Sequence, residues 1–208
     1  MDCFPPLPID FDEAKHEYIW RPTGERMAQS VTTVCSTLKN KWELEAIEKH
    51  RPTWEPRGLH VHKALENFLN RVPKDDLLGT EWDAWVSPML DHPFWESFEP
   101  IATEYRLCDL SRSIGGSFDC LGYDHFTDRL VLLDLKSQSN RGKRYKTDAQ
   151  LGGYLSMLID ARKVLVDECL TFWARPGEAK LGDTQPPDRC LQAWEDTYSI
   201  FSMKEERV

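Results

Sequence analysis

The sequence predicts an α/β protein in which helices flank a central mixed sheet. Residues 130–136, LVLLDLK, are a short apolar run between polar segments, which is typical of a strand buried on both faces. Residues 56–70 and 147–160, one on each side of that run, carry apolar side chains at helical spacing. Further strands are expected at residues 101–107, 114–119 and 163–173. The expected order is therefore helix, three antiparallel strands, helix and strand.

Composition sets the limits of the protein class. The chain has 208 residues, 40% of them hydrophobic, and eight tryptophans, so we expect one core and a single domain over residues 1–208. No apolar stretch approaches the ~20 residues that span a bilayer, so no membrane partner is expected. The N-terminal region is acidic and broken by prolines, unlike a signal or transit peptide. We therefore expect a cytoplasmic protein.

Net charge limits how the protein could bind nucleic acid, and the cysteine pattern indicates the redox state of its thiols. A formal net charge of −9 argues against nucleic-acid binding through overall attraction, so any such binding requires a local basic patch. The six cysteines form no C-x-x-C pair, and reduced thiols are expected.

Residues 1–55 are expected to form a hairpin and short helices. The hairpin spans residues 16–26, with the reversal at Pro22-Thr23-Gly24. A helix is expected to begin at Ser30 or Thr32, and a second at residues 42–50, which Pro52 ends.

The helix at residues 56–70 carries a polar stripe beside its apolar face. Gly58, His62 and Glu66 are each four residues apart and therefore share one side of the helix. Taken alone, the stripe is explained by close packing at Gly58, a core-edge histidine and a solvated carboxylate. Residues 71–100 are expected to form an insertion of one helix and a loop, whose tryptophans pack on the core rather than stack on bases.

The strands are expected to bring acidic residues together. Side chains alternate along a strand, so Asp134 and Lys136 emerge on one face while Leu135 points away. A turn at residues 123–127 would fold the preceding strand back antiparallel and bring Asp119 towards Asp134. Glu104 lies one strand before Asp119.

A basic loop follows the central strand directly. Its cations, which suit contact with a phosphate backbone, are Arg141, Lys143, Arg144 and Lys146. The next helix, capped by Thr147 or Asp148, places Gln150 and Tyr154 on one face because they are four residues apart. After the strand at 163–173, a loop at 177–187 and an amphipathic helix at 189–206 are expected.

Two neighbouring carboxylates and a lysine indicate metal-assisted chemistry. Carboxylates repel each other unless they share a cation or a proton, so Asp119 and Asp134 suit a hard divalent metal. Mg²⁺ or Mn²⁺ fits oxygen ligands, and His62 as a third ligand favours Mn²⁺. Such a metal can polarise a phosphodiester and generate hydroxide, while Lys136 orients or deprotonates the attacking water. The predicted reaction is phosphodiester hydrolysis.

These motifs resemble those of a known nuclease superfamily. Asp119 with Asp134-Leu135-Lys136 resembles the PD-(D/E)XK signature, and Gly58-x-x-x-His62-x-x-x-Glu66 with Gln150-x-x-x-Tyr154 is similar to its RecB-like exonuclease branch. The resemblance covers about residues 30–174. It implies a restriction-endonuclease-like core (αβββαβ) at residues 56–174 with the insertion at 71–100. The hairpin and helices of 1–55 precede this core, and a loop and helix at 175–208 follow it.

The resemblance also implies residue roles. The metal ligands would be His62, Asp119, Asp134 and the Leu135 backbone carbonyl, with Glu66 and Glu104 as secondary ligands of a second metal through water. Lys136 would be catalytic together with Asp134 and Asp119. Gln150 and Tyr154 would support the site and the substrate strand, beside the basic loop.

The chain departs from the family pattern in two respects. Phe118 stands where the signature has proline, which leaves Asp119 usable. Iron–sulfur members of the branch, including CRISPR-associated exonucleases, need one cysteine before the histidine helix and three near the C-terminus. Here Cys35 is followed, after the core, only by Cys169 and Cys190, so no iron–sulfur cluster is expected.

The resulting prediction is a stand-alone, metal-dependent DNA exonuclease that acts on single-stranded or duplex ends. The alternatives are a structure- or sequence-specific endonuclease with the same core, and a non-catalytic DNA-binding protein. In a further alternative, Asp134 and Lys136 form only an ion pair at a strand end. Cleavage polarity, DNA versus RNA and oligomeric state are left open.

Overall fold

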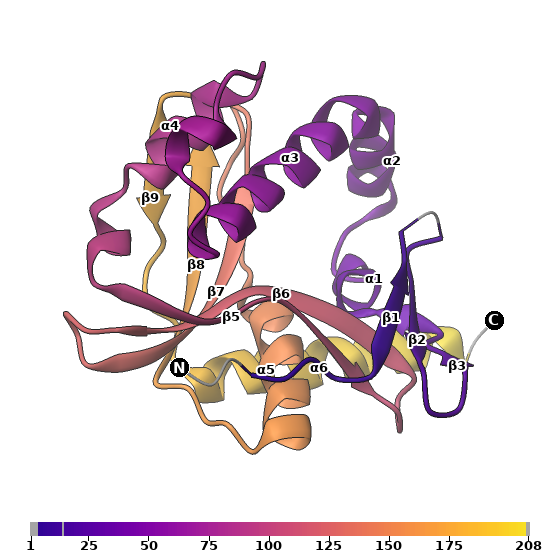
Figure 1. The fold of residues 1–208 in the computed structure, drawn as a ribbon. Coiled ribbons are helices and arrows are strands. Elements are labelled where there is room, and N and C mark those ends of the chain that lie inside the picture. The colour runs from indigo at the N-terminus through magenta and orange to yellow at the C-terminus, as the bar shows by residue number, and fades with distance from the viewer. Residues whose placement is uncertain (1–3, 14, 207–208) are drawn as a thin grey trace.

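The computed structural model describes residues 4–13 and 15–206, and these form a mixed α/β fold (Figure 1). Cys3 lies outside the described residues. The central sheet is mixed and helices flank it, as the sequence predicts. A small antiparallel sheet packs beside it, built from β1 (Ile9–Asp12), β2 (Glu17–Trp20) and β3 (Glu25–Arg26). No described helix has both the length and the apolar character required to cross a bilayer.

The central sheet combines antiparallel and parallel pairs. Its strands are β4 (Gln29–Ser30), β5 (Phe98–Asp109), β6 (Ile114–Asp124), β7 (Arg129–Ser137), β8 (Glu168–Arg175) and β9 (Glu178–Leu181). The order is β4-β6-β7-β8-β9, and β5 pairs with β6. β5, β6 and β7 are consecutive antiparallel strands, whereas β4 runs parallel to β6 and β8 parallel to β7.

Two helical layers cover the two faces of the sheet (Figure 1). α3 (Arg51–Leu69) and α4 (Asp83–Leu90) lie on one face, and α1 (Val31–Ser36), α5 (Asp148–Arg162) and α6 (Pro187–Glu205) lie on the other. Side chains alternate along β7, so Leu132 packs towards α5, whereas Leu133 and Leu135 pack towards α3. The central strand is therefore buried on both faces, as its apolar run predicts.

The N-terminal region follows the prediction closely, with two additions. The hairpin of β2 and β3 forms, but β1 and the short strand β4 were not predicted. α1 starts where expected, since the Ser30 side chain accepts a hydrogen bond from the Thr33 N–H. α2 (Lys41–Lys49) begins at an Asn40 capping box.

The predicted start of the main helix at residue 56 is wrong. α3 begins at Arg51, so one helix crosses the expected boundary between residues 55 and 56. Pro52 lies in its first turn, where a missing backbone N–H costs nothing, and therefore helps to start α3 rather than only ending α2. Pro56 is accommodated inside the helix one turn later.

The insertion at residues 71–100 contains α4, as expected, and two short 3₁₀ turns, η1 (Lys74–Leu77) and η2 (Pro93–Glu96). Trp85, Phe94 and Trp95 pack against the core on the α3 side, which confirms their structural role. Trp95 stacks on Phe172 of β8, with ring centroids 5.0 Å apart.

Several predictions in the C-terminal part need correction. The strand expected from residue 163 starts at Glu168, because α5 runs to Arg162 and Lys163 ends it in a left-handed conformation (φ 57°). The expected loop at 177–187 contains β9, which pairs antiparallel with β8, and α6 starts at Pro187. Thr147 precedes α5, but its hydroxyl bonds Thr171 and does not cap the helix.

Candidate active site

The site lies where the central sheet divides along one edge of β6. β5 pairs along the other edge of this strand. On the dividing edge, β4 pairs with Ile114 and Gly115, and β7 pairs only from Cys120 onward. No strand of the described residues therefore pairs with residues 116–119 on this edge. We call this interruption the fork.

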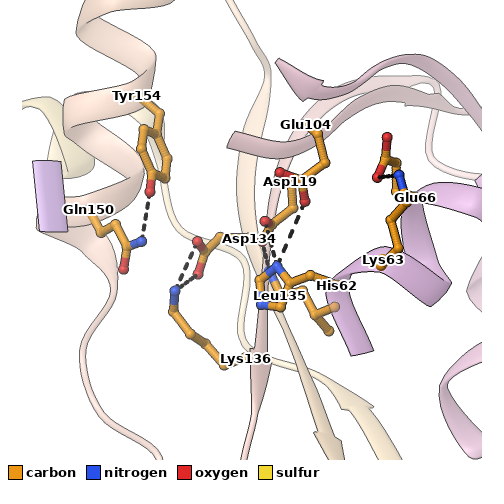
Figure 2. Close-up of polar contacts among 10 residues, drawn as sticks. All are labelled: His62, Lys63, Glu66, Glu104, Asp119, Asp134, Leu135, Lys136, Gln150 and Tyr154. Carbon is orange, nitrogen blue, oxygen red and sulfur yellow. Dashed lines mark hydrogen bonds and ion pairs between the residues drawn. The ribbon is translucent and has the colours of Figure 1, made fainter. Parts of the chain in front are cut away.

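Asp119 holds the fork together through its carboxylate. Oδ2 accepts a short hydrogen bond from the Leu135 backbone N–H, and Oδ1 lies 2.8 Å from His62 Nδ1 (Figure 2). The N–H and C=O groups of one strand residue leave the strand on the same side, so the Leu135 carbonyl also faces the fork. The position of this carbonyl is compatible with the ligand role that the resemblance implies.

Glu104 completes a cluster of three potential metal ligands. One ligand atom from each of His62, Glu104 and Asp119 lies within 4.8 Å of the others. Glu104 stands in the left-handed region (φ 46°), and the β5–β6 ladder skips the pair of Glu104 and Asp119. A non-glycine residue in that conformation is strained, and such strain is concentrated at functional sites. An imidazole nitrogen and two carboxylates are donors that Mn²⁺ and Mg²⁺ accept.

The cluster combines opposite charges and is reachable from solvent. The side chains of His62 and Glu104 are 30% and 35% exposed, so an ion could reach them. Burial alone lowers the pKa of His62, but the charge of Asp119 and hydrogen bonds to Asp119 and Glu104 outweigh it and raise this pKa to about 10. Burial opposes ionisation of Asp119, yet His62 and Lys136 keep its pKa below the ordinary value. Burial, together with the charge of Asp119, raises the pKa of Glu104.

Asp134, which is buried, and Lys136, which is half-buried, form an ion pair beside this cluster, on the α5 side of β7 (Figure 2). Lys136 Nζ donates a 3.0 Å hydrogen bond to Oδ1 of Asp134 and lies 2.7 Å from Oδ2, an ion-pair contact that lacks hydrogen-bond geometry. Burial and the charge of Asp119 raise the pKa of Asp134 to about 6, against the effect of Lys136. Burial lowers the pKa of Lys136, but the carboxylate of Asp134 outweighs burial and raises it. Lys136 is therefore an ammonium group at neutral pH.

Gln150 and Tyr154 stand behind this pair on α5. Gln150 Nε2 donates a 2.8 Å hydrogen bond to the Tyr154 hydroxyl (Figure 2). The Tyr154 ring packs so closely on Gly116 that a Cβ there would lie 2.9 Å from its Cε1. Gln150 and Tyr154 therefore support the unpaired stretch of β6 from the α5 side. The Tyr154 ring is buried, so it is not available to contact a substrate strand.

Glu66 stands apart from the ligand cluster. Its carboxylate lies 2.7 Å from Lys63 Nζ, one turn of α3 beyond His62 (Figure 2). The structure thus brings together His62, Glu104 and Asp119 as the closest set, with Asp134 paired to Lys136 and Glu66 paired to Lys63.

The basic loop beside Lys136 is exposed yet held in place. Among the described residues, no carboxylate lies within ion-pair distance of its four cations, Arg141, Lys143, Arg144 and Lys146. Gln138 Nε2 donates to the Lys143 carbonyl (2.8 Å), and Arg175 Nη2 donates to Gln138 Oε1 (2.8 Å) and the Gly142 carbonyl (2.7 Å). Sequence patterns did not predict this anchor. The position of Gln138 just after Lys136 was the one signal that could have suggested it.

Comparison with known proteins adds little to this geometry. No family model matches the chain, and no curated protein matches its sequence. Among solved structures, the chain is similar to a crystal structure of SSO0001, with 12% sequence identity and a TM-score of 0.35 over 82% of this chain and 75% of that chain. A likeness at that level assigns neither a family nor an activity.

Proposed function

We propose that this protein is a metal-dependent DNA exonuclease that hydrolyses phosphodiester bonds from DNA ends. The observation that carries the proposal is the convergence of two groups at one fork in the sheet. The first is the ligand cluster of His62, Glu104 and Asp119, and the second is the ion pair of Asp134 and Lys136. A basic loop without carboxylate partners among the described residues stands directly beside them.

The fold supports the proposal through its order of elements. α3, the antiparallel strands β5, β6 and β7, then α5 and the parallel strand β8 follow the αβββαβ order of a restriction-endonuclease-like core. In such a sheet the fork between the second and third antiparallel strands exposes backbone and carboxylate oxygens together. We infer that the protein has this core.

The metal would be held by His62, Glu104 and Asp119, with Asp134 and the Leu135 carbonyl at the same fork. Bound Mg²⁺ or Mn²⁺ supplies a Lewis acid that polarises the phosphodiester and lowers the pKa of a coordinated water. The donor set fits, because it combines oxygen ligands with one imidazole.

Lys136 has a defined task in this mechanism. Its ammonium group, held by Asp134, places a positive charge where the phosphate gains negative charge as the water attacks. Because Asp134 raises the pKa of Lys136, the side chain stays an ammonium group that stabilises charge and donates hydrogen bonds to the phosphate oxygens. Gln150 and Tyr154 act behind it by keeping residues 116–119 in place.

The test is cleavage of an end-labelled single strand, an end-labelled duplex and a closed circle, each with Mn²⁺, Mg²⁺ or EDTA. We expect linear DNA to be shortened from an end with either metal, the circle to survive, and EDTA to stop the reaction. Cutting of the circle would show that the protein is an endonuclease rather than an exonuclease. Failure to cut any substrate with any metal would contradict nuclease activity altogether.

The basic loop is expected to bind the DNA backbone. Changing Arg141, Lys143, Arg144 and Lys146 to glutamine should weaken binding to a single strand and flatten its salt dependence, by about 0.7 in logarithmic slope for each phosphate that the loop no longer neutralises. Binding would be measured by fluorescence anisotropy over a range of salt concentrations in EDTA. The matched control changes four arginines that already have carboxylate partners: Arg21, Arg26, Arg129 and Arg189. An equal decrease of slope in both variants would show that the loop has no special role.

A further inference from the structure

Arg57 is a buried cation that has no carboxylate partner among the described residues. It lies on α3 five residues before His62, and only 7% of the residue is exposed. Its Nη2 donates a 3.3 Å hydrogen bond to the Ser137 carbonyl, and its guanidinium lies 5.3 Å from the centre of the Trp85 ring. Its Nε is buried and makes no hydrogen bond to the described part of the chain. No carboxylate of the described residues lies within 4.0 Å of it.

An arrangement of this kind is unfavourable in the free protein. A buried charge costs several kcal/mol unless an opposite charge or a full set of hydrogen bonds compensates it. Burial lowers the pKa of Arg57, yet a guanidinium remains charged at neutral pH. Arg112, by contrast, has a carboxylate partner and makes two 2.9 Å hydrogen bonds to Glu195. An acidic chain that leaves Arg57 unpaired among its described residues therefore keeps a cation available for an external anion.

Arg175, at the end of β8, is a second arginine with a buried Nε that makes no hydrogen bond to the described residues. No carboxylate in the described part of the chain pairs with it either. Both arginines bond to the segment just after Lys136: Arg57 donates to the Ser137 carbonyl, and Arg175 donates to the Gln138 side chain. Trp85, which packs on Arg57, donates a 2.7 Å hydrogen bond to the Gln138 carbonyl. The buried Arg57, the half-buried Arg175 and the four exposed cations of the basic loop thus gather at the end of β7.

We propose that Arg57 binds a backbone phosphate of the DNA strand next to the bond being cut, and that Arg175 and the basic loop complete this subsite. The inference rests on the proposed function and names a substrate contact for it. The planar guanidinium suits a phosphate, to which it can donate two parallel hydrogen bonds. Trp85 covers one face of the group, so its N–H edge is the binding part. Because Nε is covered in the free protein, binding entails a small displacement of the guanidinium or of the neighbouring loop.

The test is Arg57→Met, measured as binding of an oligothymidine strand over a range of salt concentrations in EDTA, together with thermal unfolding. We expect binding to weaken by about tenfold and the salt slope to fall by about 0.7, because one phosphate is no longer neutralised. We also expect an unchanged or higher melting temperature, since an apolar side chain replaces an uncompensated buried cation. A purely structural arginine would instead lower the melting temperature and leave the slope unchanged.

Arg112→Met is the matched control. Arg112 is paired with Glu195 on α6, so its removal should lower the melting temperature and leave DNA affinity and slope unchanged. An unchanged slope in Arg57→Met overturns the subsite, whatever its melting temperature. If the wild type cleaves DNA and the slope is unchanged, only the subsite fails. If the wild type binds but never cleaves and the slope still falls, Arg57 contacts a DNA phosphate, and the nuclease activity together with the placement beside a cleaved bond is overturned. A wild type that binds no DNA overturns both.

Discussion

Replacing Lys136 by methionine is expected to slow DNA cleavage by at least about 10²- to 10³-fold, the usual effect of removing a preorganised donor to a developing oxyanion. Lys136 lies close enough to the ligand cluster for its charge to act on Asp119, and Asp134 fixes its position. The decrease should appear in the single-turnover rate with saturating Mn²⁺, because the group acts on the transition state rather than on substrate binding.

The same change should also affect stability, and a second variant separates the two effects. Asp134 is almost fully buried, and removing its cation leaves an unpaired carboxylate, which typically costs about 3–5 kcal/mol. The double variant Asp134→Asn/Lys136→Met removes both charges and should regain much of this stability without regaining activity. Thermal unfolding and cleavage measured side by side distinguish loss of the fold from loss of the chemistry.

Lys41→Met is the control for charge alone. The Lys41 side chain is 85% exposed on α2, outside the site and the basic loop, so its removal should leave the single-turnover rate near that of the wild type. A Lys136→Met protein that cleaves at the wild-type rate would remove Lys136 from the mechanism.

Mn²⁺ is expected to stabilise the wild-type protein and to lose this effect in Asp119→Asn. A ligand that binds only the folded state adds about 2.7 kcal/mol at one hundred times its dissociation constant. Asp119 contributes to the cluster directly and also orients His62 and the Leu135 N–H, so its charge should be decisive. The measurement is the shift of the melting temperature on adding Mn²⁺ to each variant, with EDTA as the reference.

Two further variants assign the remaining carboxylates. Glu104→Gln should reduce the Mn²⁺-induced shift, because Glu104 belongs to the cluster. Glu66→Gln should retain the shift, because Glu66 pairs with Lys63. A full shift in Asp119→Asn would place the ion elsewhere on the protein, and the absence of a shift in Glu66→Gln would make Glu66 a ligand after all.

Elements whose signals are local could be predicted from the amino-acid sequence. The apolar run of β7 predicted a buried strand, and the twofold period of a strand placed Asp134 and Lys136 on one face. Helical spacing placed His62 on α3 and brought Gln150 next to Tyr154 on α5. These features depend on residues a few positions apart, so periodicity was sufficient to predict them.

The assembly of the site depends on contacts between segments that are distant in the chain. The fork arises because β6 pairs first with β4 and then with β7 along one edge. Glu104, inside β5, has a left-handed backbone conformation, and its side chain lies near Asp119. Arg57 is buried by Trp85 and Ser137, which lie far from it in the chain. Each feature depends on pairing or packing between distant segments. Local propensity and residue spacing do not predict such pairing, because its energy depends on which surfaces meet in the folded chain.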